Sequence, residues 1–95
     1  MSLTNDDSSN WEVIFSPTAD KQFGKLDASV QRSIKRYILT HLTIKENPRR
    51  FGKPLSGNLK EFWSYRVGDY RLICELHDHI VTITVVKVGH RKEVY

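Results

Sequence analysis

The feature that most constrains the fold is a turn in the second half of the chain, flanked on both sides by alternating apolar and polar side chains. From residue 60 onward apolar residues recur with a period of two, which is typical of β-strands. The triplet Val-Gly-Asp at residues 67–69 interrupts this alternation and favours a tight hairpin turn. The sequence therefore predicts two adjacent antiparallel strands, with Arg66 and Arg71 on the same face of the sheet and on either side of the turn.

The first half of the chain predicts one strand and two helices. A short β-type run at residues 11–15 is followed by Ser-Pro, which favours a helix start, so a first helix is expected over residues 17–24. Asp27 is positioned to cap a longer second helix, in which apolar residues recur at helical spacing up to about Lys45.

The second half predicts a loop and three strands. Residues 49–59 hold two glycines, a proline and three basic residues, a composition typical of a cationic loop. The two hairpin strands follow, and a second turn at residues 77–79 leads into a β-branched run over residues 80–88. We therefore expect an α+β fold of order βααβββ, a small, largely antiparallel sheet with both N-terminal helices packed on one face.

A single domain accounts for the chain of 95 residues. We expect this domain to span residues 11–95 and the polar residues 1–10 to form a disordered leader. The apolar neighbours of Cys74, the single cysteine, indicate a core residue in a reducing compartment. Since no signal peptide and no apolar stretch of membrane-spanning length is found, we expect a cytoplasmic protein that does not contact a membrane.

The positive charge is concentrated in the second half. Residues 1–44 hold five basic and five acidic side chains, whereas residues 45–95 hold ten basic and six acidic ones, so the net charge of +4 lies there. A local basic field gathers phosphate, which favours a polyanionic partner over a merely soluble basic protein.

Arginine and the C-terminal residues supply the candidate site. The guanidinium groups of Arg66 and Arg71 suit a phosphodiester because each donates paired hydrogen bonds, although pairing with nearby carboxylates is the structural alternative. After the next strand, His90 can exchange protons and Arg91 can neutralise a leaving oxygen. Tyr95 is either a packing residue or a platform on which a nucleobase stacks.

Other chemistries lack the residues that they need. The chain has no phosphate-binding glycine loop, no dinucleotide fingerprint, no zinc spacing and no evident nucleophile–histidine arrangement. His77 and His79 on one turn are too sparse a signal for a metal. We therefore expect neither a metal nor another cofactor.

Three segments resemble the toxins of the RelE/ParE superfamily, and lie closer to its RelE branch. They are PRRFGKPLSG at residues 48–57, FWSYRVGDYRLIC at residues 62–74 and VGHRKEVY at residues 88–95, and the resemblance spans roughly residues 11–95. It implies the toxin of a type II toxin–antitoxin system, a ribosome-dependent endoribonuclease. Such a toxin cuts mRNA in the ribosomal A site through attack of the RNA's own 2′-hydroxyl on the adjacent phosphate. The resemblance also implies a cognate antitoxin that is disordered when free, wraps the domain and forms a hetero-oligomer with it.

The same resemblance implies roles for individual residues. Arg71 matches the arginine that stabilises the transition-state phosphate, Arg91 the arginine at the leaving 5′-oxygen, and Tyr95 the tyrosine that stacks on a base. Arg66 matches a further basic position. The remaining RNA-binding candidates are basic residues of the predicted loop and its end: Arg49, Arg50, Lys53 and Lys60.

The sequence departs from the family where a general base is expected. Phe62 and Ser64 stand where the best-known RelE toxins have strand lysines, and residues 52–55 lack the loop glutamate of a sister branch. Our hypothesis is that His90 exchanges the proton while Lys53 or Lys60 supplies charge. Two rivals stay open: a ParE-like inhibitor that binds DNA gyrase without catalysis, and an RNA-binding or antitoxin-bound module with a weakened catalytic set.

Overall fold

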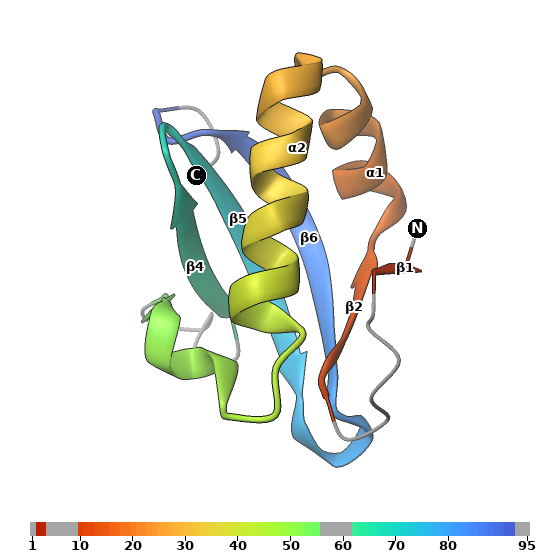
Figure 1. The fold of residues 1–95 in the computed structure, drawn as a ribbon, viewed down its shortest axis with the longest axis vertical. Coiled ribbons are helices and arrows are strands. Elements are labelled where there is room, and N and C mark those ends of the chain that lie inside the picture. Colours follow the sequence, from red (N-terminus) through yellow and green to blue (C-terminus); the bar gives the residue numbers. More distant parts are fainter. Residues whose placement is uncertain (1, 4–9, 56–61, 93–95) are drawn as a thin grey trace.

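A mixed six-stranded sheet of order β1-β2-β6-β5-β4-β3 forms the frame of the protein (Figure 1). The structure, a computed structural model, describes residues 2–3, 10–55 and 62–92. The strands are β1 (Ser2–Leu3), β2 (Glu12–Phe15), β3 (Lys53–Pro54), β4 (Phe62–Val67), β5 (Tyr70–His77) and β6 (Thr82–His90). The pair β2 and β6 is parallel and the other pairs are antiparallel. The expected α+β order βααβββ is confirmed, with the short strands β1 and β3 added to it.

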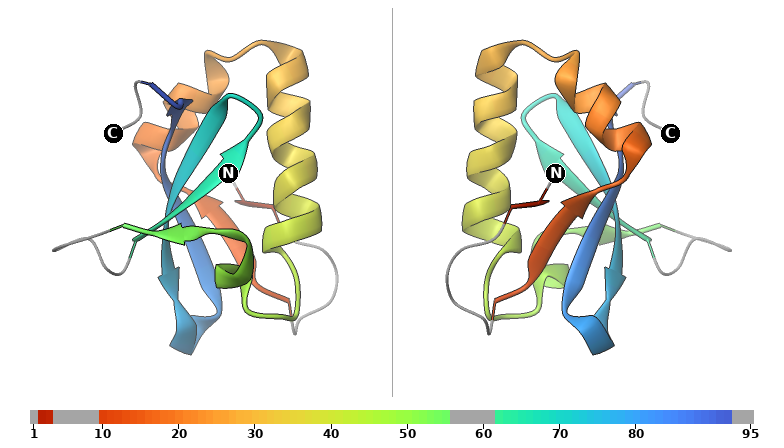
Figure 2. Two further views of the ribbon diagram at one scale, coloured as in Figure 1. Left: turned by 90° about the vertical axis from the view of Figure 1, so that its left-hand side faces the viewer. Right: turned by 90° about the vertical axis from the view of Figure 1, so that its right-hand side faces the viewer.

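Both helices begin where the sequence predicts. Helix α1 (Pro17–Gly24) starts after Ser16, whose Oγ accepts a hydrogen bond from the Ala19 amide at 3.1 Å. Helix α2 (Ala28–Tyr37) follows Asp27, which occupies the capping position but forms no side-chain capping bond, contrary to expectation. Helix α2 lies across the sheet in Figure 1 and to one side of it in Figure 2.

Helix α2 is shorter than predicted. The expectation that it extends to about Lys45 was wrong. It ends at Tyr37 and continues as one π-helical turn over Ile38–Leu42, in which the Thr43 amide donates to the Ile38 carbonyl at 2.9 Å. The Thr40 hydroxyl donates to the Arg36 carbonyl at 2.8 Å, and such side-chain bonds compete with the regular helical ladder. The turn keeps Ile38 and Leu42 buried while it ends the helix early.

One hydrophobic core lies between the helices and one face of the sheet. It joins the helix residues Ala19, Phe23, Ile34, Ile38 and Leu42 to sheet residues that include Val13, Phe15, Tyr65, Leu72, Cys74, Leu76, Ile83, Val85 and Val88. The expectation that Cys74 is a core residue is confirmed, since its thiol is free and fully buried, and burial raises its pKa. Within the described residues, no helix combines the length and apolar character needed to cross a bilayer.

Part of the segment predicted to be a loop, residues 49–59, forms regular secondary structure. A 3₁₀ turn spans Pro48–Phe51, and the Asn47 side chain caps it by accepting from the Arg49 amide at 3.0 Å. Strand β3 then pairs with β4, and the Tyr65 hydroxyl donates to the Pro48 carbonyl at 3.0 Å. The loop prediction was therefore wrong for residues 49–54, while residues 56–59 lie outside the described part.

Two boundary predictions shift by a few residues. The turn after β5 is a 3₁₀ turn over Asp78–Ile80, so β6 begins at Thr82 and extends to His90 rather than ending at residue 88. At the other end of the chain, β1 lies within residues 1–10, which the sequence predicts as a disordered leader. The other residues of that segment up to residue 9 lie outside the described part, and the prediction stays open for them.

Candidate functional site

The face of the sheet that carries no helix gathers several cations. Arg66 on β4 and Arg71 on β5 are direct cross-strand partners, which confirms that they share one face on either side of the turn. Arg71 is half-buried and its Nη1 donates to the Ser64 hydroxyl at 3.4 Å. Arg66 is exposed, and its Nε donates to the Gly68 carbonyl at 3.1 Å. We call this surface the helix-free face, defined by Lys53, Ser64, Arg66, Arg71, Ile73 and Lys87.

Lys53 joins this face through strand β3. Cross-strand pairing forms a row of four residues across the sheet. The order of the row is Lys53 on β3, Ser64 on β4, Ile73 on β5 and Lys87 on β6. Opposite residues of paired strands share a face, and neighbouring strands lie about 4.8 Å apart. The row therefore has a lysine at each end and the buried side chains of Ser64 and Ile73 at its centre. Arg71 lies two positions along β5 from Ile73, on the same face.

Lys87 is the residue on this face that sequence reasoning missed. The pairing of β5 with β6 shifts register between Ile73 and Cys74, so that Ile73 lies opposite Lys87 but Cys74 lies opposite Val85. The skipped residue, Val86, is a β-bulge, which reverses the faces on which the following side chains lie. Strict alternation from Val85 would have placed Lys87 with the core, and no local signal in the sequence marks the bulge.

His90 and Arg91 are separated by the end of β6. His90 pairs with Tyr70 and its ring contacts the Tyr70 ring edge-on at 5.7 Å, so strand alternation places it on the face opposite to Arg71. Arg91 is exposed, and its amide donates to the Asp69 carbonyl at 2.8 Å. This bond holds Arg91 against the hairpin turn, beside the end of the sheet that carries Arg66 and Arg71.

The two arginines of the 3₁₀ turn lie away from the helix-free face. Arg49 donates to both carboxylate oxygens of Asp78, at 2.9 and 2.8 Å, and its guanidinium lies 5.7 Å from the centre of the Trp63 ring. Hydrogen bonding to Arg49 holds the pKa of the Asp78 carboxyl below its ordinary value. Arg50 is exposed and lies 5.0 Å from the centre of the Phe51 ring. Lys60 and Tyr95 lie outside the described residues.

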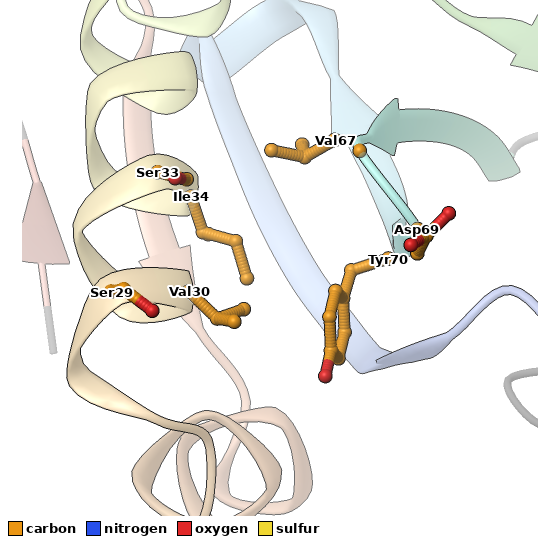
Figure 3. A pocket seen from close by; sticks show the side chains of 8 residues that line it. Ser29, Val30, Ser33, Ile34, Val67, Asp69 and Tyr70 are labelled. Carbon is orange, nitrogen blue, oxygen red and sulfur yellow. The ribbon is translucent and has the colours of Figure 1, made fainter.

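A concavity lies on the helix side, between α2 and the β4–β5 hairpin. Figure 3 shows the apolar side chains of Val30, Ile34, Val67 and Tyr70 around it, and its volume is about 320 Å³. An adjoining hollow of about 270 Å³ continues along α2 and is lined by residues that include Arg36 and Arg66. Arg66, whose Nε bonds to the hairpin turn, therefore borders both this hollow and the helix-free face. The two hollows form an apolar groove with cations at one end, which we call the α2 groove.

Among the residues that the structure describes, no three His, Cys, Asp or Glu side chains come together in a way that could hold a metal ion. Glu75 also lies on this face, since it alternates along β5 with Arg71 and Ile73, and its carboxylate pairs with His77. The groups of the helix-free face that can bind an anion are its arginine, lysine and hydroxyl groups. Such groups bind and neutralise anionic oxygen atoms, and arginine matches the geometry of phosphate.

The chain has a small mixed sheet with two N-terminal helices on one face and cations on the other. Residues 13–95 match the family described as the ParE toxin of type II toxin–antitoxin system, parDE. The chain belongs to this RelE/ParE toxin family, so the resemblance seen in the sequence is confirmed.

The chain is similar to three relatives from one organism. Toxin RelG of Mycobacterium tuberculosis is 31% identical over 85 residues, which cover 90% of this chain and 95% of RelG. Toxin RelE of the same organism is 26% identical over 89 residues, covering 94% and 90% of the two chains. A chain of the toxin–antitoxin complex RelBE2 from Mycobacterium tuberculosis superposes with a TM-score of 0.79 at 29% identity, covering 94% of this chain and 100% of that chain.

Proposed function

We propose that this toxin is a ribosome-dependent endoribonuclease that cleaves mRNA in the A site. The observation that carries the proposal is the grouping of Lys53, Arg66 and Arg71 on the helix-free face. The resemblance to the RelE branch in the sequence supports the same reading. A gyrase inhibitor that acts by binding alone would need no such set of phosphate-matching side chains around a buried hydroxyl.

The reaction needs positioned charge more than it needs a protein nucleophile. The RNA 2′-oxygen forms a bond to the adjacent phosphorus while the bond from phosphorus to the 5′-oxygen breaks, which leaves a 2′,3′-cyclic phosphate and a 5′-hydroxyl. The proton of the 2′-hydroxyl leaves as the nucleophile forms, and the 5′-oxygen gains a proton. Negative charge grows on the phosphoryl oxygens during the step, and fixed cations stabilise that charge without having to reorganise.

The geometry supports specific roles for the cations. Arg71 is half-buried and held by Ser64, so its guanidinium is restrained to contact the reacting phosphate. Lys53 supplies charge from the strand beside Ser64, and Arg91, held against the hairpin turn, contacts the leaving 5′-oxygen. Because His90 lies on the opposite face, we do not assign the proton exchange to it. In this proposal Tyr95 stacks on a base, the role that the family resemblance implies for it.

The test is single-turnover cleavage on ribosomes programmed with a defined A-site codon. We expect Arg71→Ala to lower the cleavage rate by about 10²-fold or more while ribosome affinity changes little, because the interaction strengthens in the transition state. Arg32, an exposed arginine on α2, provides the matched control, and Arg32→Ala should cleave normally. Equal losses of rate and affinity for Arg71→Ala would show that it only docks the protein.

Tyr95 is tested with two substitutions in the same assay. Stacking needs a flat ring, so Tyr95→Phe should retain most cleavage and Tyr95→Ala should lose it. Wild-type protein that leaves mRNA intact but inhibits purified gyrase would replace the nuclease proposal with the ParE-like one.

We also propose that a cognate antitoxin segment lies in the α2 groove. The apolar lining and the cations at one end suit an amphipathic, acidic segment that folds on binding. The related RelBE2 toxin was solved as a toxin–antitoxin complex, which supports a protein partner of this kind. Val30→Glu places a negative charge in the groove, where it would repel an acidic antitoxin segment, so the co-expressed antitoxin should no longer rescue growth. Ser29→Glu, at the rim of the groove, should retain more of this rescue.

A further inference from the structure

We propose that Lys87 is a further phosphate-contacting residue of the RNA-cleaving site, acting from β6 on the side of Arg71 opposite to Lys53. The inference rests on the proposed nuclease function and adds to it a residue from a third strand. It is carried by the β-bulge, the cross-strand register and the exposure of the lysine.

The bulge determines where Lys87 lies. Ile83 and Val85 alternate into the core, and unbroken alternation would bring the next residue of that set, at position 87, to the same buried face. The extra residue Val86 restores Val88 to the core and turns Lys87 to the helix-free face instead. Bulges are frequent next to active sites, where they redirect a side chain.

The register brings Lys87 within reach of the phosphate proposed to bind Arg71. Lys87 lies directly opposite Ile73, and Arg71 lies two positions along β5 from Ile73. Such diagonal neighbours have backbones about 7–8 Å apart, a span that the long side chains of lysine and arginine bridge easily. The residue directly opposite Arg71 is Gly89, so β6 itself places no side chain between the two cations.

The charge of Lys87 is available for a ligand. Lys87 is exposed, and among the described residues the ion pairs formed by carboxylates involve Arg49 and His77 rather than Lys87. Ile73, which lies between Ser64 and Lys87 in the row, is buried and apolar. A phosphate over this apolar centre would have Arg71 and Lys87 on one side and Lys53 on the other.

The experiment compares Lys87→Ala and Lys87→Arg with Lys21→Ala in the programmed-ribosome assay. Lys21 is an exposed lysine on α1, on the helix side, so its removal changes the net charge equally. We expect Lys87→Ala to lower the single-turnover rate by about 10- to 100-fold, Lys87→Arg to retain most of it, and Lys21→Ala to match wild type. Thermal midpoints should agree, and if Lys87→Ala lowers the midpoint, Lys87→Gln decides, since it keeps most of the side-chain stem.

A double substitution separates a shared phosphate from a general basic field. Since Lys87 and Arg71 act on one phosphate, their combined loss should be smaller than the product of the two single losses. A wild-type rate for Lys87→Ala, or a loss equal to that of Lys21→Ala, overturns this inference and leaves the nuclease proposal intact. Absence of cleavage by the wild-type protein overturns both.

Discussion

Gly52 lies directly against the ring of Tyr65. A Cβ atom built at Gly52 would lie 2.8 Å from Cε1 and 2.9 Å from Cζ of that ring, closer than side-chain carbons approach one another. Tyr65 cannot easily give way, because it is fully buried and its hydroxyl donates to the Pro48 carbonyl. The missing side chain at Gly52 thus lets β3 come alongside β4 and places Lys53 opposite Ser64.

Gly52→Ala should therefore destabilise the protein. Forcing a methyl group into a packed core typically costs about 1–3 kcal/mol. Urea unfolding monitored by tryptophan fluorescence gives the free energy of unfolding. Gly24→Ala is the control, since a Cβ there meets no atom within 4 Å and alanine favours a helix. Equal stabilities for the two variants would contradict the close contact.

The pair Arg49–Asp78 should stabilise the fold weakly and in a pH-dependent way. The side chain of Asp78 is 65% exposed, and exposed pairs typically contribute about 0.2–1 kcal/mol. Because the pKa of Asp78 is lowered from 3.8, the stabilisation is present above that pH and is lost as the pH falls below it. A double-mutant cycle with Arg49→Ala and Asp78→Ala measures the coupling at neutral and at acidic pH. A coupling that persists unchanged in acid would rule out an ion pair.

Alkaline pH should unfold the protein partly through Tyr37. Burial, assisted by neighbouring Cys74, raises the pKa of Tyr37 from 10.0 to about 12. The unfolded chain therefore releases this proton first, so the free energy of unfolding falls as the pH rises from 10 towards 12. Tyr37→Phe should show a shallower decline than wild type in urea titrations over this range. Parallel curves would show that Tyr37 takes no part in it.

Replacing Val81 by glycine should stabilise the protein. Its backbone has φ 49° and ψ 48°, a left-handed conformation that is unfavourable for a β-branched residue. Val81→Gly removes this strain and should stabilise the protein by about 1 kcal/mol. Ile80 is the exposed neighbouring residue and does not have a positive φ, so Ile80→Gly should not stabilise the protein. A thermal midpoint that falls for both variants would mean that the Val81 side chain contributes more than its backbone strain removes.

The sequence predicts those parts of the fold that depend on local patterns. The Ser16 cap, the turn before Tyr70 and the alternation across β4 and β5 are each marked by neighbouring residues, and the shared face of Arg66 and Arg71 follows from them. The 3₁₀ turn at Pro48–Phe51 also had a local signal, because Asn47 followed by proline is a capping sequence.

The rest depends on residues far apart in the chain. Strand β3 consists of Lys53 and Pro54, which have little strand preference of their own, and it forms because Gly52 lets it approach β4. Lys87 could not be placed because the bulge that turns it forms only when β5 and β6 pair. For the same reason the position of His90 on the opposite face could not be read from its neighbours.

The parallel pairing of β2 with β6 has a consequence for how the protein is made. Translation produces β2 early and β6 late, yet β6 is the strand that both β2 and β5 need as a neighbour. A nascent chain that ends before residue 82 lacks β6, so β2 and β5 each keep an unpaired edge. Such a chain has Arg71 but not the strand that carries Lys87. Incomplete translation products that lack β6 are therefore expected not to close the sheet, so that the fold can form only after the last strand has been made.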